Sequence, residues 1–364
     1  MRVMTVFGTR PEIIRLSRIL PLLDAATEHT SVFTGQNFDP ALSDVFFDEM
    51  AVRRPDHALG VKGSGFAEQL GQILVGCERV MRDVRPERLL LLGDTNSALA
   101  AIVAKRLGIA VFHMEAGNRC YDDRVPEEVN RRIIDHASDV LLPYTRGSAD
   151  NLLREGIHPS RIFVTGNPIF EVLAAYRVQT AASSVLARLG LQQGGYLLVS
   201  LHRAENVDVE ARLRSFFQAF ERLAARHKTT VVISTHPRTR QRIDALAITA
   251  GAGVRLLPPF GFFDFVHLQQ HARCVLSDSG TVQEESAILR VPVVTLRDVT
   301  ERPETLEHGC NILTGADPER IVAAVDLALG QETGWTIPEG YEAPHVSRTV
   351  VRLLVGHLQR GIAT

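Results

Sequence analysis

The stretch Asp278-Ser-Gly280, followed by Gln-Glu-Glu at residues 283–285, could bind a ligand with both a phosphate and a hydroxylated ring. The apolar residues 274–276 before it are typical of a buried parallel strand, and the residues after it predict a helix with Asp278 and Ser279 as N-cap residues. Gly280 would let the backbone turn sharply and approach a ligand closely. The first N–H groups of a helix attract anions, so they could bind a pyrophosphate while a carboxylate binds ribose hydroxyls. Ordinary strand-to-helix turns look similar, so other parts of the chain must decide.

Three carboxylates in the first half of the chain, Asp94, Glu115 and Glu127, could do acid-base chemistry. Asp94 and Glu115 follow predicted strands, and Glu127 falls on the first turn of a predicted helix. Each has an ordinary alternative: Asp94 could be only a helix cap, Glu127 only a partner of the helix dipole, and Glu115 only a surface loop residue. If they converge, like charges raise the pKa of at least one, which suits general acid-base catalysis near neutral pH.

A set of cationic residues could bind an anion beside these acids. Its arginines are Arg10, Arg15, Arg119, Arg131 and Arg302. His202 and His236 also follow predicted strands, without a carboxylate at helical spacing, and the position of His236 before Pro237 favours a phosphate or base contact. Either histidine could instead be a core residue with satisfied ring nitrogens.

Several familiar motifs are missing from the sequence. No lysine follows a glycine at P-loop spacing, no GxGxxG follows residues 3–7, and no GxSxG marks a hydrolase. A nucleotide-triphosphate site, a nicotinamide dehydrogenase and a serine hydrolase are therefore poorly supported. No metal-ligand spacing stands out, and the four cysteines include no CxxC pair, so neither a zinc site nor a disulfide framework is implied. A reducing cytoplasm is the simple inference.

The bulk properties predict a soluble protein of two domains. The chain has 364 residues, 45% hydrophobic and 23% charged, with a formal net charge of -2. The charge gives no global basic surface for nucleic acid. No apolar run approaches a membrane span, and the N-terminus lacks the features of a signal peptide.

Strands alternate with helices in two blocks, which predicts two doubly wound, Rossmann-like α/β domains. Strands are predicted at residues 3–7, 31–34, 88–92, 110–113, 140–143 and 162–165, and then at 196–200, 231–234, 254–257, 274–277, 293–296 and 311–313. Gly166-Asn-Pro168 marks the boundary between the blocks. The helix at residues 210–226 has a core-facing stripe of Leu213, Phe216, Phe217, Phe220 and Leu223. Ligands of such domains bind at the carboxyl ends of the strands, and we expect the active site in the cleft between the domains.

The chain resembles the non-hydrolysing UDP-N-acetylglucosamine 2-epimerase family along nearly its whole length. Eight stretches carry the resemblance: Phe7-Gly-Thr-Arg-Pro-Glu12, Gly93-Asp-Thr-Asn96, His113-Met-Glu-Ala-Gly117, Pro126-Glu-Glu-Val-Asn-Arg131, Gly166-Asn-Pro168, His202-Arg-Ala-Glu-Asn206, Asp278-Ser-Gly280 with Gln283-Glu-Glu285, and Arg297-Asp-Val-Thr-Glu-Arg-Pro-Glu304. The resemblance implies a glycosyltransferase-B-like fold whose final helix, residues 346–360, returns to the first domain. The expected domains are residues 1–167 with 346–364, and residues 168–345, the second of which binds UDP.

The resemblance also implies an activity, inversion at C2 of a UDP-linked 2-acetamido sugar without nicotinamide or metal. In the family mechanism the C2 proton is removed and UDP leaves, which gives a 2-acetamidoglucal-like intermediate. UDP then adds back while a proton arrives on the opposite face. Departing UDP needs cations and amides around its pyrophosphate.

Roles carry over to the residues that match the family's motifs. The catalytic set is Asp94, Glu115, Glu127 and His202, with the histidine near the diphosphate. The positions that hold the UDP-sugar are Arg10, Arg15, Arg131, His236, Ser279, Gly280, Glu285 and Arg302. Glu285 would bind the ribose hydroxyls, and Arg15 stands where the family commonly has lysine. A homodimer is implied, with residues 66–84 as a possible contact.

Three departures from the family's pattern bear on substrate and regulation. Thr281 replaces a usual second glycine, and Gln36-Asn-Phe38 replaces a stretch that many members use to bind an activating UDP-sugar. Residues 118–126 and 261–264 look more like the subgroup that epimerises UDP-2-acetamido-2,6-dideoxy-L-hexoses. The preferred substrate is UDP-N-acetylglucosamine, giving UDP-N-acetylmannosamine, and the 6-deoxy sugar is the alternative.

Other classes of protein remain open at this stage. A glycosyltransferase of the same fold would need an acceptor groove, whereas three carboxylates around one sugar favour proton transfer at carbon. A hydrolysing relative would release free N-acetylmannosamine. A sugar-nucleotide sensor without catalysis would survive only if Asp94→Asn left turnover unchanged.

Overall fold

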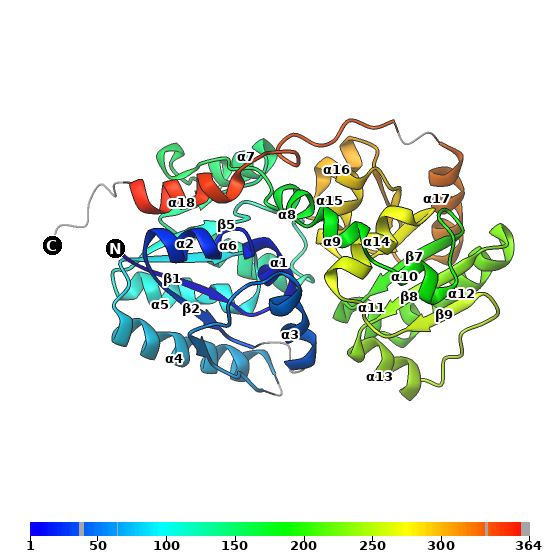
Figure 1. Cartoon of the computed structure of the whole chain (residues 1–364), viewed down its shortest axis with the longest axis horizontal. Helices are drawn as coiled ribbons and strands as arrows, with labels where there is room; N and C mark the ends of the chain where they lie inside the picture. Colours follow the sequence, from blue (N-terminus) through cyan, green and yellow to red (C-terminus); the bar gives the residue numbers. More distant parts are fainter. Residues whose placement is uncertain (36–39, 64, 332–333, 358–364) are drawn as a thin grey trace. The chain divides into compact units, whose positions relative to one another are not determined.

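The computed structural model describes residues 1–35, 40–63, 65–331 and 334–357 (Figure 1). The chain forms two compact units, Met1–Ala175 with Glu339–Thr364, and Tyr176–Pro338. The sequence placed the divisions after residues 167 and 345. Helix α8 (Ile169–Ala175) belongs to the first unit, because it packs against α1 (Arg10–Leu16). No helix among the described residues is long and apolar enough to span a membrane.

The first unit is built on a parallel sheet of six strands in the order β3-β2-β1-β4-β5-β6. The strands are β1 (Arg2–Phe7), β2 (Glu28–Phe33), β3 (His57–Ala58), β4 (Arg88–Leu92), β5 (Ala110–Met114) and β6 (Val140–Leu142). The remaining helices are α2 (Leu20–Ala26), α3 (Pro40–Glu49), α4 (Phe66–Val84), η1 (Asn96–Leu99), α5 (Ala100–Arg106), α6 (Pro126–Ala137), α7 (Arg146–Arg154), η2 (Pro159–Arg161) and α18 (Val346–Gly356). Alternate residues of the central strands, such as Met4, Leu89 and Val111, pack with α4, α5 and α6 in one apolar cluster, so these helices cover one face of the sheet.

The second unit repeats this topology in the order β12-β11-β10-β7-β8-β9. Its strands are β7 (Tyr196–Leu201), β8 (Thr230–Thr235), β9 (Val254–Leu257), β10 (Cys274–Ser277), β11 (Val293–Thr295) and β12 (Asn311–Leu313). Its helices are α9 (Arg177–Ala181), α10 (Val185–Leu189), α11 (Ala204–Val207), α12 (Glu210–His227), α13 (Pro237–Ala245), α14 (Phe262–His271), α15 (Gly280–Leu289), α16 (Pro303–Glu307) and α17 (Pro318–Gly330). The predicted stripe of α12 is confirmed, since all five of its residues are buried in the core of this unit.

Both sheets have the strand order of the Rossmann fold, so the predicted fold class is confirmed. In each sheet the chain leaves the first strand toward one edge and later returns to its other side. The reversal points lie between β1 and β4 and between β7 and β10. The loops after these four strands are therefore where ligands of such sheets bind.

Some predicted elements differ from the structure. Residues 162–165 are not a strand, because only Ile162 forms a bridge, to Leu141. The N–H of Thr165 donates to the carbonyl of Pro143, and proline has no N–H with which to extend the ladder. The final helix ends at Gly356 and packs on α2 within the first unit. Gln36-Asn-Phe38 and residues 358–360 lie outside the described residues.

Candidate active site

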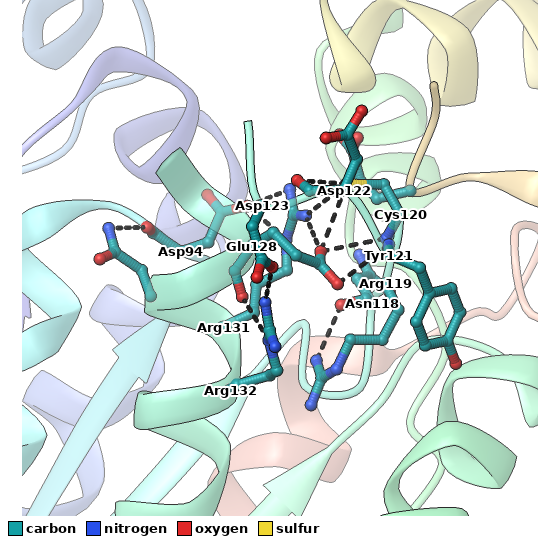
Figure 2. Close-up of polar contacts among 12 residues, drawn as sticks. Asp94, Asn118, Arg119, Cys120, Tyr121, Asp122, Asp123, Glu128, Arg131 and Arg132 are labelled. Carbon is teal, nitrogen blue, oxygen red and sulfur yellow. Dashed lines mark hydrogen bonds and ion pairs between the residues drawn. The ribbon is translucent and has the colours of Figure 1, made fainter. Parts of the chain in front are cut away.

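Asp94 follows β4 and is held by an arginine from α6. The Arg131 guanidinium contacts Asp94 Oδ2 from Nε at 2.8 Å and from Nη2 at 2.7 Å. Its Nη1 donates to Glu128 Oε2 at 2.7 Å, so Arg131 lies between two carboxylates (Figure 2). Glu128 also accepts from the backbone N–H groups of Cys120 and Tyr121. The first helical turns of α6 thereby fix both the Asp94 side chain and the loop that precedes α6.

Glu115 follows β5 and forms a buried ion pair with Arg15 of α1. Its φ of 66° lies in the left-handed region, which is uncommon for a residue with a side chain. Its backbone N–H donates to the carbonyl of Leu142 at 3.1 Å, which helps to hold this conformation. A Cβ built on Gly93 would lie 4.0 Å from Glu115 Oε2, so this carboxylate lies against the turn that carries Asp94. The structure therefore brings Asp94 and Glu115 together with their arginines.

The other predicted residues of the first unit are Glu127, Arg10 and Arg119. Glu127 is half-buried on the first turn of α6. The Arg10 guanidinium carbon lies 5.4 Å from the centre of the Phe46 ring. Arg119 does not contribute a cation to the acids above, since it pairs with Asp135 at 2.8 Å and with Glu155 at 2.7 Å.

Glu12 is a buried carboxyl that motif reasoning did not single out. It accepts hydrogen bonds from the N–H groups of Gly8 and Thr9 at the start of α1, and from the hydroxyl of Thr95 beside Asp94. It therefore ties the loops after β1 and β4 together. Burial raises the pKa of Glu12 to about 7, against the opposing effect of these hydrogen bonds.

In the second unit, His202 follows β7 and contacts a carboxylate from the neighbouring strand end. Its Nδ1 lies 3.1 Å from Asp278 Oδ1, while the imidazole remains about a third exposed at 36%. Asp278 also accepts from the backbone N–H groups of His202 and Arg203. Burial opposes ionisation, but His202 and these N–H groups lower the pKa of Asp278 to about 2. Asp278 is thus an anchor for the loop after β7, and the prediction that it caps the following helix is wrong.

Several of the other residues predicted to bind the nucleotide lie at or near the start of α15. Ser279 is the N-cap residue, and Gly280 begins the helix without a left-handed φ, so the expected sharp turn is not its role. A Cβ on Gly280 would lie 2.7 Å from Glu301 Oε1 and 3.3 Å from the guanidinium carbon of Arg302. Glycine is therefore required for a close approach of these side chains.

Arg302 is buried in a network of ion pairs. It contacts Glu284 at 2.7 Å and Glu301 at 3.1 Å, and Glu301 also pairs with Arg297 at 2.7 Å. Glu285 lies buried on α15, and its Oε2 accepts a hydrogen bond from the Gln269 amide at 3.0 Å. The ring centre of His236 lies 6.4 Å from that of His202, which brings the two predicted histidines together.

The two Rossmann-type sheets and the charged loops at their reversal points define an enzyme of the glycosyltransferase-B-type fold. The glycosyltransferase WaaG shares this fold at a TM-score of 0.62, with 12% identity over 98% of this chain and 100% of that one.

The chain belongs to the UDP-N-acetylglucosamine 2-epimerase family, whose sequence profile matches residues 23–355. A UDP-N-acetylglucosamine 2-epimerase of Methanocaldococcus jannaschii is 37% identical over 349 residues, which are 93% of this chain and 95% of the relative. A UDP-2,3-diacetamido-2,3-dideoxy-D-glucuronate 2-epimerase of Pseudomonas aeruginosa is 34% identical over 362 residues, 97% of this chain and 100% of that one. A crystal structure of the M. jannaschii enzyme in complex with UDP-GlcNAc and UDP has a TM-score of 0.92 at 36% identity, over 97% of this chain and 99% of that one. The predicted family and enzyme class are confirmed.

Proposed function

We propose that this enzyme interconverts UDP-N-acetylglucosamine and UDP-N-acetylmannosamine by elimination and re-addition of UDP. The observation that carries the proposal is the pair of arginine-held acids, Asp94 with Arg131 and Glu115 with Arg15, at neighbouring strand ends. Inverting a carbon centre needs a proton removed on one face and a proton delivered on the other. Neighbouring carboxyl groups fixed by ion pairs suit this two-sided task.

The chemistry explains why an anion-binding site is needed beside the acids. The C2 proton of the sugar is not next to a carbonyl, so a base alone removes it slowly. Departure of UDP leaves positive charge at C1, which acidifies the C2 proton. The leaving diphosphate must be stabilised as it gains charge. We assign this task to Arg10, His202, His236 and the N-terminus of α15, and assign the ribose hydroxyls to Glu285.

Mutation of the acids tests the proposal. We expect Asp94→Asn, Glu115→Gln and Glu127→Gln each to lower kcat by at least about a hundredfold, the usual minimum for general acid-base catalysis. UDP should still bind each variant in a calorimetric titration. Asp83→Asn, at an exposed carboxylate on α4, is the matched control and should leave kcat unchanged. Near-normal turnover in all three acid variants would remove the assignment.

A second substrate is favoured by one observation. The P. aeruginosa relative, which covers this chain almost completely, is named for a diacetamido glucuronate. The 6-deoxy L-sugar remains the other alternative from the sequence. Incubating the enzyme with each UDP-sugar and following epimerisation by NMR distinguishes them. Turnover of UDP-N-acetylglucosamine at least tenfold slower than turnover of another sugar would overturn the preferred substrate.

We also propose that the protein is a cytoplasmic homodimer. Its four cysteines are free, as expected in a reducing compartment. Val75 of α4, Ile102 of α5, and Val129 and Ile133 of α6 are exposed apolar side chains on adjacent helices, and we propose that a second copy covers them. Light scattering should give twice the chain mass, and Val75→Glu with Ile133→Glu should halve it, whereas Val178→Glu in the other unit should not. A wild-type mass equal to one chain would contradict the dimer.

A further inference from the structure

His113 is a buried histidine that the proposed chemistry does not use, and both of its ring nitrogens face acceptors. Nδ1 lies 2.8 Å from Asp135 Oδ1, and Nε2 lies 2.8 Å from the backbone carbonyl oxygen of Gly93. A carbonyl oxygen can only accept, so Nε2 carries a proton. A carboxylate oxygen also accepts, so a second proton lies between Nδ1 and Oδ1. One proton is therefore on Nε2, donated to Gly93, and the second lies between the imidazole and the Asp135 carboxyl.

The surroundings of Asp135 decide which partner holds the second proton. The other oxygen, Oδ2, accepts from Arg119 Nη1 at 2.8 Å and from the backbone N–H of Gly117 at 3.1 Å. Burial opposes ionisation, but His113 and Arg119 lower the pKa of Asp135. The carboxyl therefore stays ionised, and the proton stays on the imidazole. The His113 imidazole is therefore the donor and the Asp135 carboxylate the acceptor in this buried pair.

This pair holds the two turns that carry the proposed acids. Through His113, Asp135 fixes the carbonyl of Gly93, the residue before Asp94. Through its own Oδ2, it fixes the N–H of Gly117, two residues after Glu115. The second turn packs closely against α7, because a Cβ on Gly117 would lie 2.1 Å from the carbonyl oxygen of Ser148. One side chain of α6 thus joins both turns.

We propose that Asp135 is a positioning residue for Asp94 and Glu115, and that it acts by presenting one acceptor to the N–H of His113 Nδ1 and the other to the N–H of Gly117. The inference deepens the proposed epimerisation and rests on it. The hydrogen bonds of Asp135 to His113 and to Gly117 and the hydrogen bond of His113 to Gly93 must all be present together. The left-handed φ of Glu115 persists only while the surrounding contacts hold it. Loss of the second proton would leave two lone pairs facing each other across 2.8 Å.

The charged groups around the imidazole limit what else could set its protonation. Asp135 of α6 contacts it directly, and the turn after β4 contributes the neutral carbonyl of Gly93. Further from the imidazole, Arg119 in the loop after β5 pairs with Asp135 and with Glu155, the residue after α7. His136 of α6 lies 3.5 Å from Glu155. Asp135 is therefore the group whose removal should change the proton count of His113.

Asp135→Asn is the test, because the amide preserves shape and removes the charge. Its oxygen can still accept from Arg119 and Gly117, while its NH₂ group donates to His113 Nδ1, which must then be unprotonated. Proton NMR of the whole wild-type protein at neutral pH should show two slowly exchanging ring N–H signals for His113, and the variant should show one. This readout needs no substrate, so it separates failure of the inference from failure of the proposed function.

Activity supplies the second readout. At pH 8 the kcat of Asp135→Asn should lie within about threefold of wild type, and it should fall at least tenfold at lower pH, where a proton on His113 Nδ1 would face the NH₂ group of the asparagine. The wild type should lack this fall. Asp139→Asn, which alters a carboxylate that holds the N–H of Val111 and the Lys105 ammonium, should follow the wild-type profile. One ring N–H signal in the wild type, or superimposable pH profiles for wild type and Asp135→Asn, would overturn the proposal.

Discussion

Asp94 and Glu115 each face an arginine, but they differ in their access to solvent. The Asp94 side chain is 21% exposed, whereas that of Glu115 is 5% exposed. Asp94 follows β4, but its partner Arg131 comes from α6, and Glu115 follows β5, but its partner Arg15 comes from α1. Neither arginine lies on the helix that directly follows the strand of its acid. The orientation of both acids therefore depends on how these helices pack rather than on local turn chemistry.

At this scale the first prediction concerns Arg131. Its guanidinium contacts Asp94 and Glu128 at the same time, which a lysine ammonium at the end of a flexible chain cannot do. Arg131→Lys should therefore lower kcat by roughly tenfold to a hundredfold, the loss that a misplaced catalytic group produces. Arg132→Lys, at the exposed neighbour that pairs with Asp123, is the control for steady-state kinetics. Equal kcat values for the two variants would contradict the positioning role.

The second prediction concerns the stability contributed by Glu12. Burial raises its folded-state pKa from 4.5 to about 7, so the folded chain binds more protons than the unfolded chain between these values. Its contribution to stability is fully present below pH 4.5 and is lost as the pH rises through about 7. At about 1.4 kcal/mol per unit, the loss is about 3 kcal/mol.

Glu12→Gln removes this titration while keeping an acceptor for the N–H groups of Gly8 and Thr9. The stability advantage of wild type over the variant, measured by urea unfolding, should fall by about 3 kcal/mol between pH 4 and pH 8. Glu68→Gln, at an exposed position of α4, should show no such change. Parallel stability curves for wild type and Glu12→Gln would show that the carboxyl titrates normally.

Among the elements, α15 places its N-terminus against a rigid network of ion pairs. Gly280→Ala would put a Cβ 2.7 Å from Glu301 Oε1, and this oxygen is held by Arg302 at 3.1 Å and Arg203 at 3.7 Å. Because Glu301 is buried and paired, it cannot move aside at low cost. We expect the affinity for UDP, measured by calorimetry, to fall at least about tenfold, which corresponds to about 1.4 kcal/mol.

The control for this helix variant is Gly71→Ala in α4. No atom lies within 4 Å of the added Cβ there, and alanine favours a helix interior, so UDP affinity should be unchanged. Unchanged affinity in both variants would show that the approach of Glu301 and Arg302 to Gly280 does not matter for the nucleotide.

Much of the element order could be predicted from the sequence, because alternating apolar strands and amphipathic helices are local signals. The β4 strand and the apolar stripe of α12 are examples. Residues 162–165 misled the same reasoning, since an apolar pattern does not reveal that the partner strand ends at a proline. Short helices such as α9 and α10 carry too few residues to show periodicity.

For the site, motifs pointed to Asp94, Glu115 and His202 and also to Arg131, Arg15 and Asp278, but they did not show that these residues pair with one another. Asp135 and Asp278 contact residues that are far from them in the sequence, and Asp278 follows the strand next to the one that precedes His202. Parallel strand order could have indicated this last pair, because the carboxyl ends of adjacent strands meet at one edge. Nothing in the sequence indicated the left-handed φ of Glu115, because glycine is the usual marker of that conformation and residue 115 is a glutamate.

For the molecule as a whole, the two units have the same strand order and different charged residues after their central strands. The first unit carries arginine-held acids, and the second carries a buried arginine network and two histidines at the strand ends. We infer that one topology was adapted to two tasks, proton transfer in the first unit and nucleotide binding in the second. The account therefore depends on proton exchange at a single sugar carbon.

Epimerisation of UDP-N-acetylglucosamine in deuterium oxide tests this claim most directly. A base removes the C2 proton and an acid returns one from solvent, so NMR and mass spectrometry of the product should show one deuterium at C2. Asp83→Asn should behave as wild type, and Asp94→Asn should incorporate deuterium at least about a hundredfold more slowly. Product that forms at the normal rate with only hydrogen at C2 would contradict the account.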